Sequence, residues 1–324
     1  GHLTETPSAL TYASVVSRES VRIAFMLAAL NDLDVLTVDI RNAYLNAPCT
    51  EKVYIICGPE FGPDKRGRQA IIVRALYGLK SAGAAWHAHL KQTITDMGFK
   101  PCPADRDVYL RVGTRRNGDT YYEYLLVYTD DVLAISCFPS KILDCLEESY
   151  ILKKSSIKEP DQYLGADVKK FYLPDQPEKV RWAMGSEQYL KEALKNLKIW
   201  ADEKGYKLAY DKNSVRPLKY HPELDTSPLL PPDEANFYMC LVGITRWLVE
   251  LGRVDICNEQ SMMASYMAAP RQGHMFIGMF HMFGYLNSHR RSHIVFDDSY
   301  IPYSPSDYME FDWTEFYGDV QEPI

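Results

Sequence analysis

The sequence lacks the features that mark secreted, membrane-spanning or disulfide-stabilised proteins. None of its apolar runs approaches the roughly 18–20 residues that a membrane-spanning helix needs. Its first residues, GHLTETPSAL, contain no basic stretch followed by an apolar one, so we expect no secretory signal. Its seven cysteines are scattered and form no C-x-x-C pair, which argues against a disulfide framework or a thiolate zinc site. We therefore expect a soluble, intracellular protein with no membrane partner, either in a cytoplasmic particle or in the nucleus.

An excess of positive charge is also absent. The chain has 36 Lys and Arg against 43 Asp and Glu, and the net charge of -7 on its own argues against a polyanionic partner. Basic residues are nevertheless concentrated in the segments 65–80, 115–116, 153–158 and 290–291. A locally basic groove on an acidic protein is therefore compatible with the composition.

The order of the amphipathic segments predicts a mixed α and β part followed by helices. Apolar spacing predicts helices at 16–30, 84–99, 139–151 and 186–200, and strands at 34–40, 52–57, 69–76, 107–112, 121–128, 132–136, 162–173 and 179–184. A proline-bearing stretch at 200–232 is typical of a linker, and three more helices are expected at 234–252, 256–269 and 273–288. The mixed part has the strand, helix, hairpin, helix, strand order of a split βαβ unit.

Two adjacent carboxylates interrupt an apolar run in the segment 125–135, LLVYTDDVLAI. Asp130 and Asp131 would repel each other, and apolar surroundings disfavour both charges unless a cation is bound beside them. The split βαβ layout would place Asp39, at the end of the first strand, across from Asp130. Three carboxylates at neighbouring strand ends suit Mg²⁺, and two such ions about 3.5–4 Å apart can support nucleotidyl transfer. The alternative is a solvated hairpin turn, so the neighbouring motifs must decide.

Motifs in the correct order resemble those of the reverse transcriptases of copia-type (Pseudoviridae) long-terminal-repeat retrotransposons. VDIRNAYLNAPCTEKVYI is similar to the first catalytic motif of that family, and ALYGLKSAGAAW to its LYGLKQAPRAW signature. YTDD stands where the family has its Asp-Asp motif, and QYLGADV is similar to a primer-binding stretch. LVGITRWLVELGRVDI, followed by AAPRQGH and FGYLNSH, resembles the family's helical region. The resemblance covers nearly the whole chain, from about Tyr12 to about Asp298.

The resemblance implies an RNA-directed DNA polymerase and its fold. That fold is an α+β, right-hand polymerase palm (split βαβ, ferredoxin-like) with partial fingers and a C-terminal helical thumb or connection region. We expect residues 1–185 to form the partial fingers and the palm, 186–232 a helix and proline-bearing linker, and 233–324 the helical thumb or connection. No ribonuclease H domain is expected, because the acidic cluster of that domain is not found.

The resemblance also implies the cofactors and partners of such an enzyme. It would use two Mg²⁺ ions, with Mn²⁺ as a substitute. Its partners would be an RNA template, a DNA primer or an RNA–DNA duplex, and dNTPs. It would act as an oligomer or within a larger polyprotein.

The resemblance and the chemistry together assign roles to individual residues. Asp39, Asp130 and Asp131 would be catalytic and would hold the metal ions. Lys154 would protonate the departing pyrophosphate, although a solvated surface lysine is the alternative. Around the nucleotide we expect Ile40, Ala43, Tyr44, Tyr77, Gly78 and Lys80, and the Tyr44 ring would exclude a ribose 2′-OH unless it only packs in the core. Along the primer and template we expect Tyr128, Leu164, Gly165 and Arg246.

Two observations keep other functions open. The sequence begins after the basic fingertip stretch that precedes these motifs in the family, and if that stretch is absent from the protein, nucleotide binding is expected to be weaker. Arg246, Arg253 and His274 would contact a duplex, or only cap and pair within their helices. One alternative is therefore a catalytically silent reverse-transcriptase-like module for nucleic-acid binding or assembly. Another is a primer-independent nucleotidyl transferase on the same fold.

Overall fold

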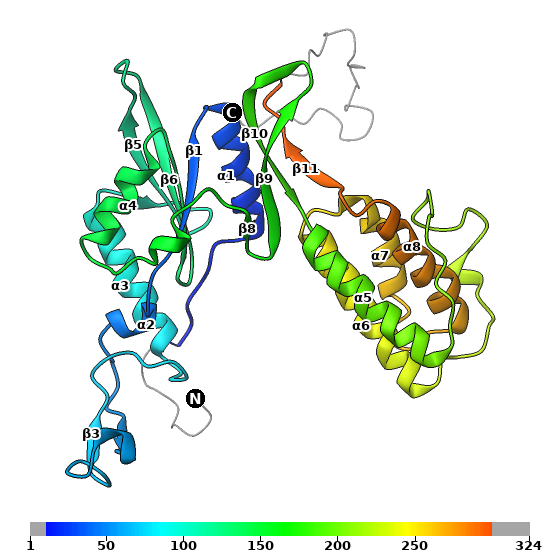
Figure 1. The fold of residues 1–324 in the computed structure, drawn as a ribbon, viewed down its shortest axis with the longest axis horizontal. Helices are drawn as coiled ribbons and strands as arrows, with labels where there is room; N and C mark the ends of the chain where they lie inside the picture. The colour runs from blue at the N-terminus through cyan, green and yellow to red at the C-terminus, as the bar shows by residue number, and fades with distance from the viewer. Residues whose placement is uncertain (1–10, 300–324) are drawn as a thin grey trace, which may run out of the picture.

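The computed structural model describes residues 11–299, which form two β-sheets and a lobe of helices (Figure 1). The first sheet and the helices around it lie on one side of the molecule, and the helical lobe lies on the other. The second sheet stands between them. This arrangement confirms a mixed α and β protein with antiparallel sheets. No helix in the described part is long and apolar enough to cross a membrane.

The first sheet carries the hairpin with the two adjacent aspartates. Its strands run in the order β1-β7-β6-β5-β4, with antiparallel neighbours: β1 (Asp34–Asp39), β4 (Lys100–Pro101), β5 (Val108–Thr114), β6 (Thr120–Tyr128) and β7 (Asp131–Ser136). On the outer edge of β1, the segment 151–158 pairs through the bridges Thr37↔Lys158 and Ile40↔Leu152. The first strand therefore lies beside the second strand of the hairpin, which is the adjacency that a split βαβ unit requires.

Helices cover both faces of this sheet. On one face, α3 (Ala82–Asp96) and α4 (Pro139–Glu147) bury their apolar side chains against the strands. On the other face lies α1 (Arg18–Leu30), which begins at Ser17. The Ser17 hydroxyl accepts a hydrogen bond from the Ser20 backbone N–H at 3.1 Å and so satisfies one of the free donors of the first turn. The buried face of α1 contains the residues that the helical spacing predicted: Val21, Ala24, Phe25 and Ala28.

The second sheet packs against α1. Its strands run in the order β11-β10-β9-β8: β8 (Gln162–Tyr163), β9 (Ala166–Leu173), β10 (Gln176–Gly185) and β11 (His293–Phe296). Phe25 of α1 stacks on Phe296 with ring centroids 5.7 Å apart, and lies 5.6 Å from the Trp182 ring. Strand β11 was not predicted, because its residues follow the last helix and join a sheet more than a hundred positions earlier in the chain.

A short ribbon extends away from the first sheet (Figure 1). It follows α2 (Ala43–Asn46) and consists of β2 (Tyr54–Ile56) and β3 (Gln69–Ile71), paired antiparallel. Both strands are shorter than the apolar runs that predicted them. The ribbon leaves large apolar side chains exposed, including Ile56 and Val73.

The helical lobe begins where β10 ends. It contains α5 (Glu187–Lys204), α6 (Pro232–Glu250), α7 (Cys257–Ala264) and α8 (Phe280–Ser288), the last preceded by a π-helical turn (His274–Met279). Between α5 and α6 only a 3₁₀ turn, Pro222–Leu224, is regular. The return of β11 to the second sheet means that the described part of 233–324 is not purely helical.

We predict that Phe25→Ala is strongly destabilising, because it removes the ring that joins α1 to the second sheet. Loss of a fully buried phenylalanine costs about 3–5 kcal/mol in a close-packed core. The loss of stability is measured from the shift of the urea midpoint, followed by circular dichroism, provided that the m-value is unchanged. The matched control is Ile23→Ala on the exposed face of the same helix, for which we expect a change of at most about 0.5 kcal/mol. Equal losses for both variants would contradict this packing.

Candidate active site

The pairing of β1 with β7 brings the predicted carboxylates together. The register places Asp39 directly opposite Asp131. Cross-strand neighbours of this kind have Cβ atoms about 4.5–5.5 Å apart. The Ile40 backbone N–H donates to the Asp130 carbonyl at 3.0 Å, so Asp130 lies one position further along the same edge. The expectation that Asp39 would lie across from Asp130 is corrected by one residue, and the three carboxylates still share one end of the sheet.

The turn that presents Asp130 is strained. Tyr128 pairs with Asp131, so Thr129 and Asp130 form a two-residue turn between β6 and β7. Thr129 has a φ of 60, a left-handed conformation that a β-branched residue rarely adopts. The Trp86 indole N–H of α3 donates to the Thr129 carbonyl at 2.7 Å. This partly buried hydrogen bond holds the turn in its strained form, and such strain is common at functional sites.

Each hairpin carboxylate is electrostatically disfavoured. Partial burial raises the pKa of Asp130, and the charge of Asp39 raises it further. Asp131 is exposed as a residue, yet the surrounding strands desolvate its carboxylate, and Asp130 and Asp39 repel it, so its pKa is also raised. Lys153 opposes both shifts. The site therefore holds more negative charge than its own residues balance.

One lysine ammonium lies on the carboxylate cluster. Lys153 Nζ is 2.5 Å from Asp39 Oδ2, and this hydrogen bond raises the pKa of Lys153. The Lys153 backbone N–H donates to the Asp39 carbonyl at 3.0 Å. Ser156 adds a clamp, because its Oγ accepts from the Asp39 N–H at 2.8 Å and donates to the Lys153 carbonyl at 2.7 Å. Both lysines are exposed, but the ammonium of Lys153 lies on Asp39, whereas the predicted Lys154 begins the following 3₁₀ turn.

The carboxylates suit a hard divalent cation. Asp39 Oδ1 is buried and has no hydrogen-bond partner, so this oxygen lacks the positive charge or donor that burial normally requires. Carboxylate oxygens are the ligands that Mg²⁺ prefers. Within residues 11–299, however, no three acidic, histidine or cysteine side chains already converge on one ion position. The donor set therefore fits the ion, whereas Lys153 now supplies the positive charge.

A cavity of about 280 Å³ opens beside Asp39 and Asp131. Its far wall is the turn between β8 and β9, where Leu164 and Gly165 have φ values of 50 and 83. Positive φ at both central residues is typical of a two-residue hairpin turn. The structure thus places Leu164 and Gly165, the predicted primer contacts, next to the carboxylates.

The predicted nucleotide contacts divide into an accessible and a buried set. Tyr44 and Tyr77 lie together with ring centroids 4.5 Å apart, and burial followed by the charge of Asp130 raises the pKa of Tyr44. Gly78 has a φ of 95, and Lys80 is exposed. Ile40 and Ala43 are fully buried in the core under the first sheet, so their side chains support the site from below.

Of the four positive or aromatic side chains predicted along the duplex, two remain accessible. Arg246 is 63% exposed and pairs with Glu250 at 3.0 Å, and Tyr128 at the end of β6 is 36% exposed. Arg253 is buried against Asp255, and His274 is buried with its ring nitrogens on Arg271 N–H and the Pro222 carbonyl. Of the two alternatives for Arg253 and His274, the structure therefore agrees with pairing inside the helical lobe and not with a duplex contact.

Sequence reasoning missed Lys153, Ser156 and Trp86. Their roles depend on the pairing of the segment 151–158 with β1 and on the packing of α3 under the hairpin. The only sequence signal was the pair of adjacent lysines, and spacing alone could not decide which of them faces the acids.

Comparison with known proteins gives one family. The model described as "Reverse transcriptase (RNA-dependent DNA polymerase)" matches residues 7–172. The Pol polyprotein of transposon RE1 of Arabidopsis thaliana is 24% identical over 269 residues, which is 82% of this chain and 17% of that protein. A transposon Ty5-1 protein of Saccharomyces cerevisiae is 25% identical over 247 residues, 74% of this chain and 71% of that protein. No solved structure matches significantly.

The match with longer relatives is partial. The Pol polyproteins of RE1, RE2 and the Nicotiana tabacum transposon TNT 1-94 are covered over 17%, 17% and 19% of their lengths. The chain therefore spans less than a fifth of each of these curated relatives.

We predict that Asp130→Asn stabilises the metal-free protein at neutral pH. The raised pKa means that the folded protein disfavours the ionised form of Asp130. The contribution of the Asp130 carboxyl to the free energy of unfolding is therefore fully present below its pKa in the unfolded chain, about 3.9, and is lost as the pH rises through its pKa in the folded protein. Asn carries no charge, so we expect a gain of up to about 1 kcal/mol at pH 7 that disappears near pH 3. Urea unfolding in EDTA measures this gain. Asp64→Asn in an exposed loop is the control, and a loss of stability in Asp130→Asn at pH 7 would contradict the electrostatics.

Proposed function

The chain belongs to the reverse transcriptase (RNA-dependent DNA polymerase) family, and from this premise we propose that it extends a primer by template-directed addition of deoxynucleotides. The observation that carries the proposal is the antiparallel register that sets Asp39 opposite Asp131, with Asp130 beside them. A cluster of carboxylates next to a cavity, in which the pKa values of Asp130 and Asp131 are raised, is expected where metal-assisted chemistry takes place.

Asp39, Asp130 and Asp131 are the proposed metal ligands. Two bound Mg²⁺ ions, or Mn²⁺ in their place, would activate the primer hydroxyl and stabilise the charge on the leaving pyrophosphate. The orphaned oxygen of Asp39 supports this assignment, because a cation is the partner that a buried carboxylate oxygen lacks.

The remaining residues of the site would donate a proton or position the substrates in this proposal. Lys153 takes the role of proton donor to pyrophosphate that the sequence had suggested for Lys154, because its ammonium already lies against the acids. Tyr44, supported by the ring of Tyr77, would pack under the sugar and exclude a 2′-OH. The turn at 164–165 would hold the primer end, and Arg246 would contact a backbone phosphate.

The substrates and the domain roles follow from the same premise. We propose an RNA template, a DNA primer or RNA–DNA duplex, and dNTPs as substrates. Residues 1–185 would act as partial fingers and palm, 186–232 as helix and linker, and 233–324 as thumb or connection. Because relatives such as that of RE1 are named Pol polyproteins, a larger polyprotein is the proposed context.

The second candidate is a silent nucleic-acid-binding module. One observation favours it, namely that Lys153 occupies the Asp39 carboxylate and lowers the negative charge available to a metal ion. This candidate predicts binding of a primer–template without extension.

We predict template-dependent primer extension by the wild type and its loss in Asp130→Asn. Removal of a direct metal ligand should reduce kcat by more than the roughly 10–100-fold typical of an outer ligand partner. The assay uses a labelled DNA primer on RNA with Mg²⁺, and Asp64→Asn is the control. Equal silence of all three proteins would support the binding module, and extension without template would support the primer-independent transferase.

We predict that Lys153→Gln lowers kcat at least about 10-fold, whereas Lys154→Gln stays within about 2-fold of the wild type. Only the first ammonium reaches the carboxylates, so only its loss removes a proton donor. Steady-state extension at several pH values measures kcat, and primer affinity is measured separately by anisotropy. A larger effect for Lys154→Gln would return the role to that residue.

A further inference from the structure

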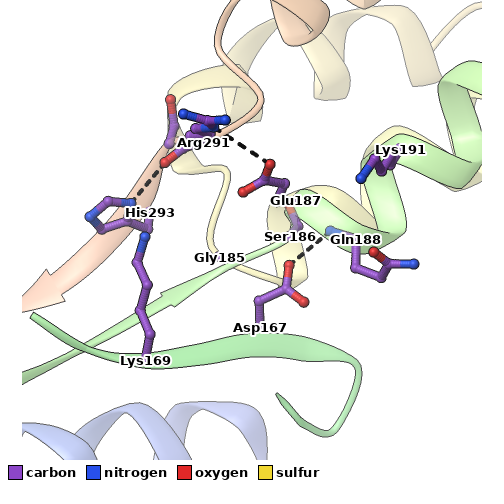
Figure 2. Close-up of a pocket in the computed structure, with 10 residues that line it drawn as sticks. Asp167, Lys169, Gly185, Ser186, Glu187, Gln188, Lys191, Arg291 and His293 are labelled. Atoms are coloured by element: carbon purple, nitrogen blue, oxygen red, sulfur yellow. Dashed lines mark hydrogen bonds and ion pairs between the residues drawn. The ribbon is translucent and has the colours of Figure 1, made fainter. Parts of the chain in front are cut away.

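A second cavity lies at the start of α5 (Figure 2), and its lining residues differ from those of the carboxylate cavity. We call it the α5 pocket; its volume is about 180 Å³. It is lined by β9, by the first turns of α5 and by the segment that leads into β11. Its basic side chains, including one histidine, come from all three places: Lys169, Lys191, Arg291 and His293. Parts of the chain that are far apart in sequence therefore place cations around one small space.

The backbone of α5 adds to this positive potential. The first turn of an 18-residue helix carries free N–H groups and the positive end of the helix dipole. Anions bind at such ends because both effects favour negative charge. The N-cap residue Ser186 makes no side-chain cap, so its hydroxyl is available to another partner.

Ser186 is an independent sign of a missing ligand. The residue is fully buried, it lines the α5 pocket, and its Oγ has no hydrogen-bond partner. A buried hydroxyl without a partner is costly, and serine at an N-cap normally satisfies itself on the helix backbone. An oxygen atom of a bound anion would accept its hydrogen bond.

The two acidic residues of the α5 pocket are already engaged. Asp167 accepts from the Gln188 backbone N–H at 2.9 Å and from Gln162 Nε2 at 3.4 Å. Glu187 lies 3.7 Å from the guanidinium of Arg291, which is 87% exposed. This ion pair is loose and solvated, so it offers little resistance to an anion that competes for the arginine. The lysines Lys169 and Lys191 then leave the α5 pocket with a positive balance.

The α5 pocket adjoins the candidate active site. Gln162 lines the cavity of Asp39 and Asp131, and the same residue donates to Asp167 in the α5 pocket. Gly165, in the turn that precedes β9, and Lys169 on β9 are four residues apart, or about 13 Å at the usual strand rise. Since one strand of a duplex carries a phosphate about every 3.4 Å of axis, this distance corresponds to about four nucleotides.

We propose that the α5 pocket binds one backbone phosphate of the nucleic-acid strand whose end lies at the carboxylates. This inference rests on the proposed polymerase function, because that function is what places a strand at Gly165. The phosphate oxygens accept from the Ser186 hydroxyl and from first-turn N–H groups of α5 other than that of Gln188, which donates to Asp167, and Lys169, Lys191 and Arg291 balance the charge.

The first experiment is independent of catalysis and uses inorganic phosphate as the probe. Titration into the full chain is followed by the amide resonances of Glu187 and Gln188. We expect saturable shifts in the wild type and in Lys204→Gln, a lysine at the far end of the same helix, and none in the double variant Lys191→Gln/Arg291→Gln. Absence of saturable shifts in the wild type, or shifts unaffected by the double variant, overturns the site whether or not the protein polymerises.

The second experiment asks where the phosphate comes from. Anisotropy with a primer–template duplex is measured from low to high salt. In the double variant we expect the slope of log K against log salt to fall in magnitude by about 0.9, because about 0.9 corresponds to the loss of one phosphate contact. The slope should be unchanged in Lys204→Gln. If the wild type shows the phosphate-induced shifts but the double variant keeps the same salt slope as the wild type, the assignment to a nucleic-acid strand is overturned. A raised KM for dNTP with an unchanged slope also overturns it, because the anion is then the nucleotide triphosphate.

Ser186→Ala separates binding from folding. A purely structural hydroxyl would lower the unfolding midpoint when removed. We expect the midpoint to stay level or rise, because the deleted hydroxyl has no partner, while phosphate binding weakens several-fold. A lower midpoint with unchanged phosphate binding contradicts the role of Ser186.

Discussion

The antiparallel pairing of β1 with β7 is the constraint on which the candidate site depends. A shift of this register by one residue would send every side chain of β1 to the opposite face of the sheet, and Asp39 would then point into the core below. The register is protected because successive residues of the two strands pack on opposite faces of the sheet. One set packs against α3 and α4, and the other set packs against α1. Packing of the whole first sheet therefore decides the position of three carboxylates at its end.

That arrangement is unfavourable by itself, and its surroundings offset the cost. Like charges opposite each other weaken a strand pair, and a β-branched residue at positive φ strains the hairpin. The segment 151–158 contributes a fixed ammonium at Asp39 and backbone bonds along the free edge of β1. The Trp86 indole fixes the turn from below. The Lys153 ammonium therefore offsets part of the repulsion among the three carboxylates.

The sequence predicted local structure well where one face of an element is buried. The apolar face of α1, the strand that ends at Asp39 and the Asp-Asp hairpin all occur at the predicted places. The sequence left a choice open where a role depends on distant partners. It allowed Arg253 and His274 either a duplex contact or pairing within their helices, and the folded helical lobe buries both residues against their own neighbours. Strand β11 has too few residues for a periodic signal, and only its pairing with β10 makes it a strand.

The sequence by itself determined which residue types stand at the strand ends, because alternation and turn chemistry are local properties of the chain. It also determined the family, because the order of the motifs is a property of the linear sequence. Only the tertiary structure decided that Asp39 faces Asp131, that Lys153 and not Lys154 reaches them, and that Lys169, Lys191 and Arg291 meet around Ser186. These relations join segments tens to more than a hundred residues apart, and the packing of sheets and helices sets such distances, whereas sequence spacing does not.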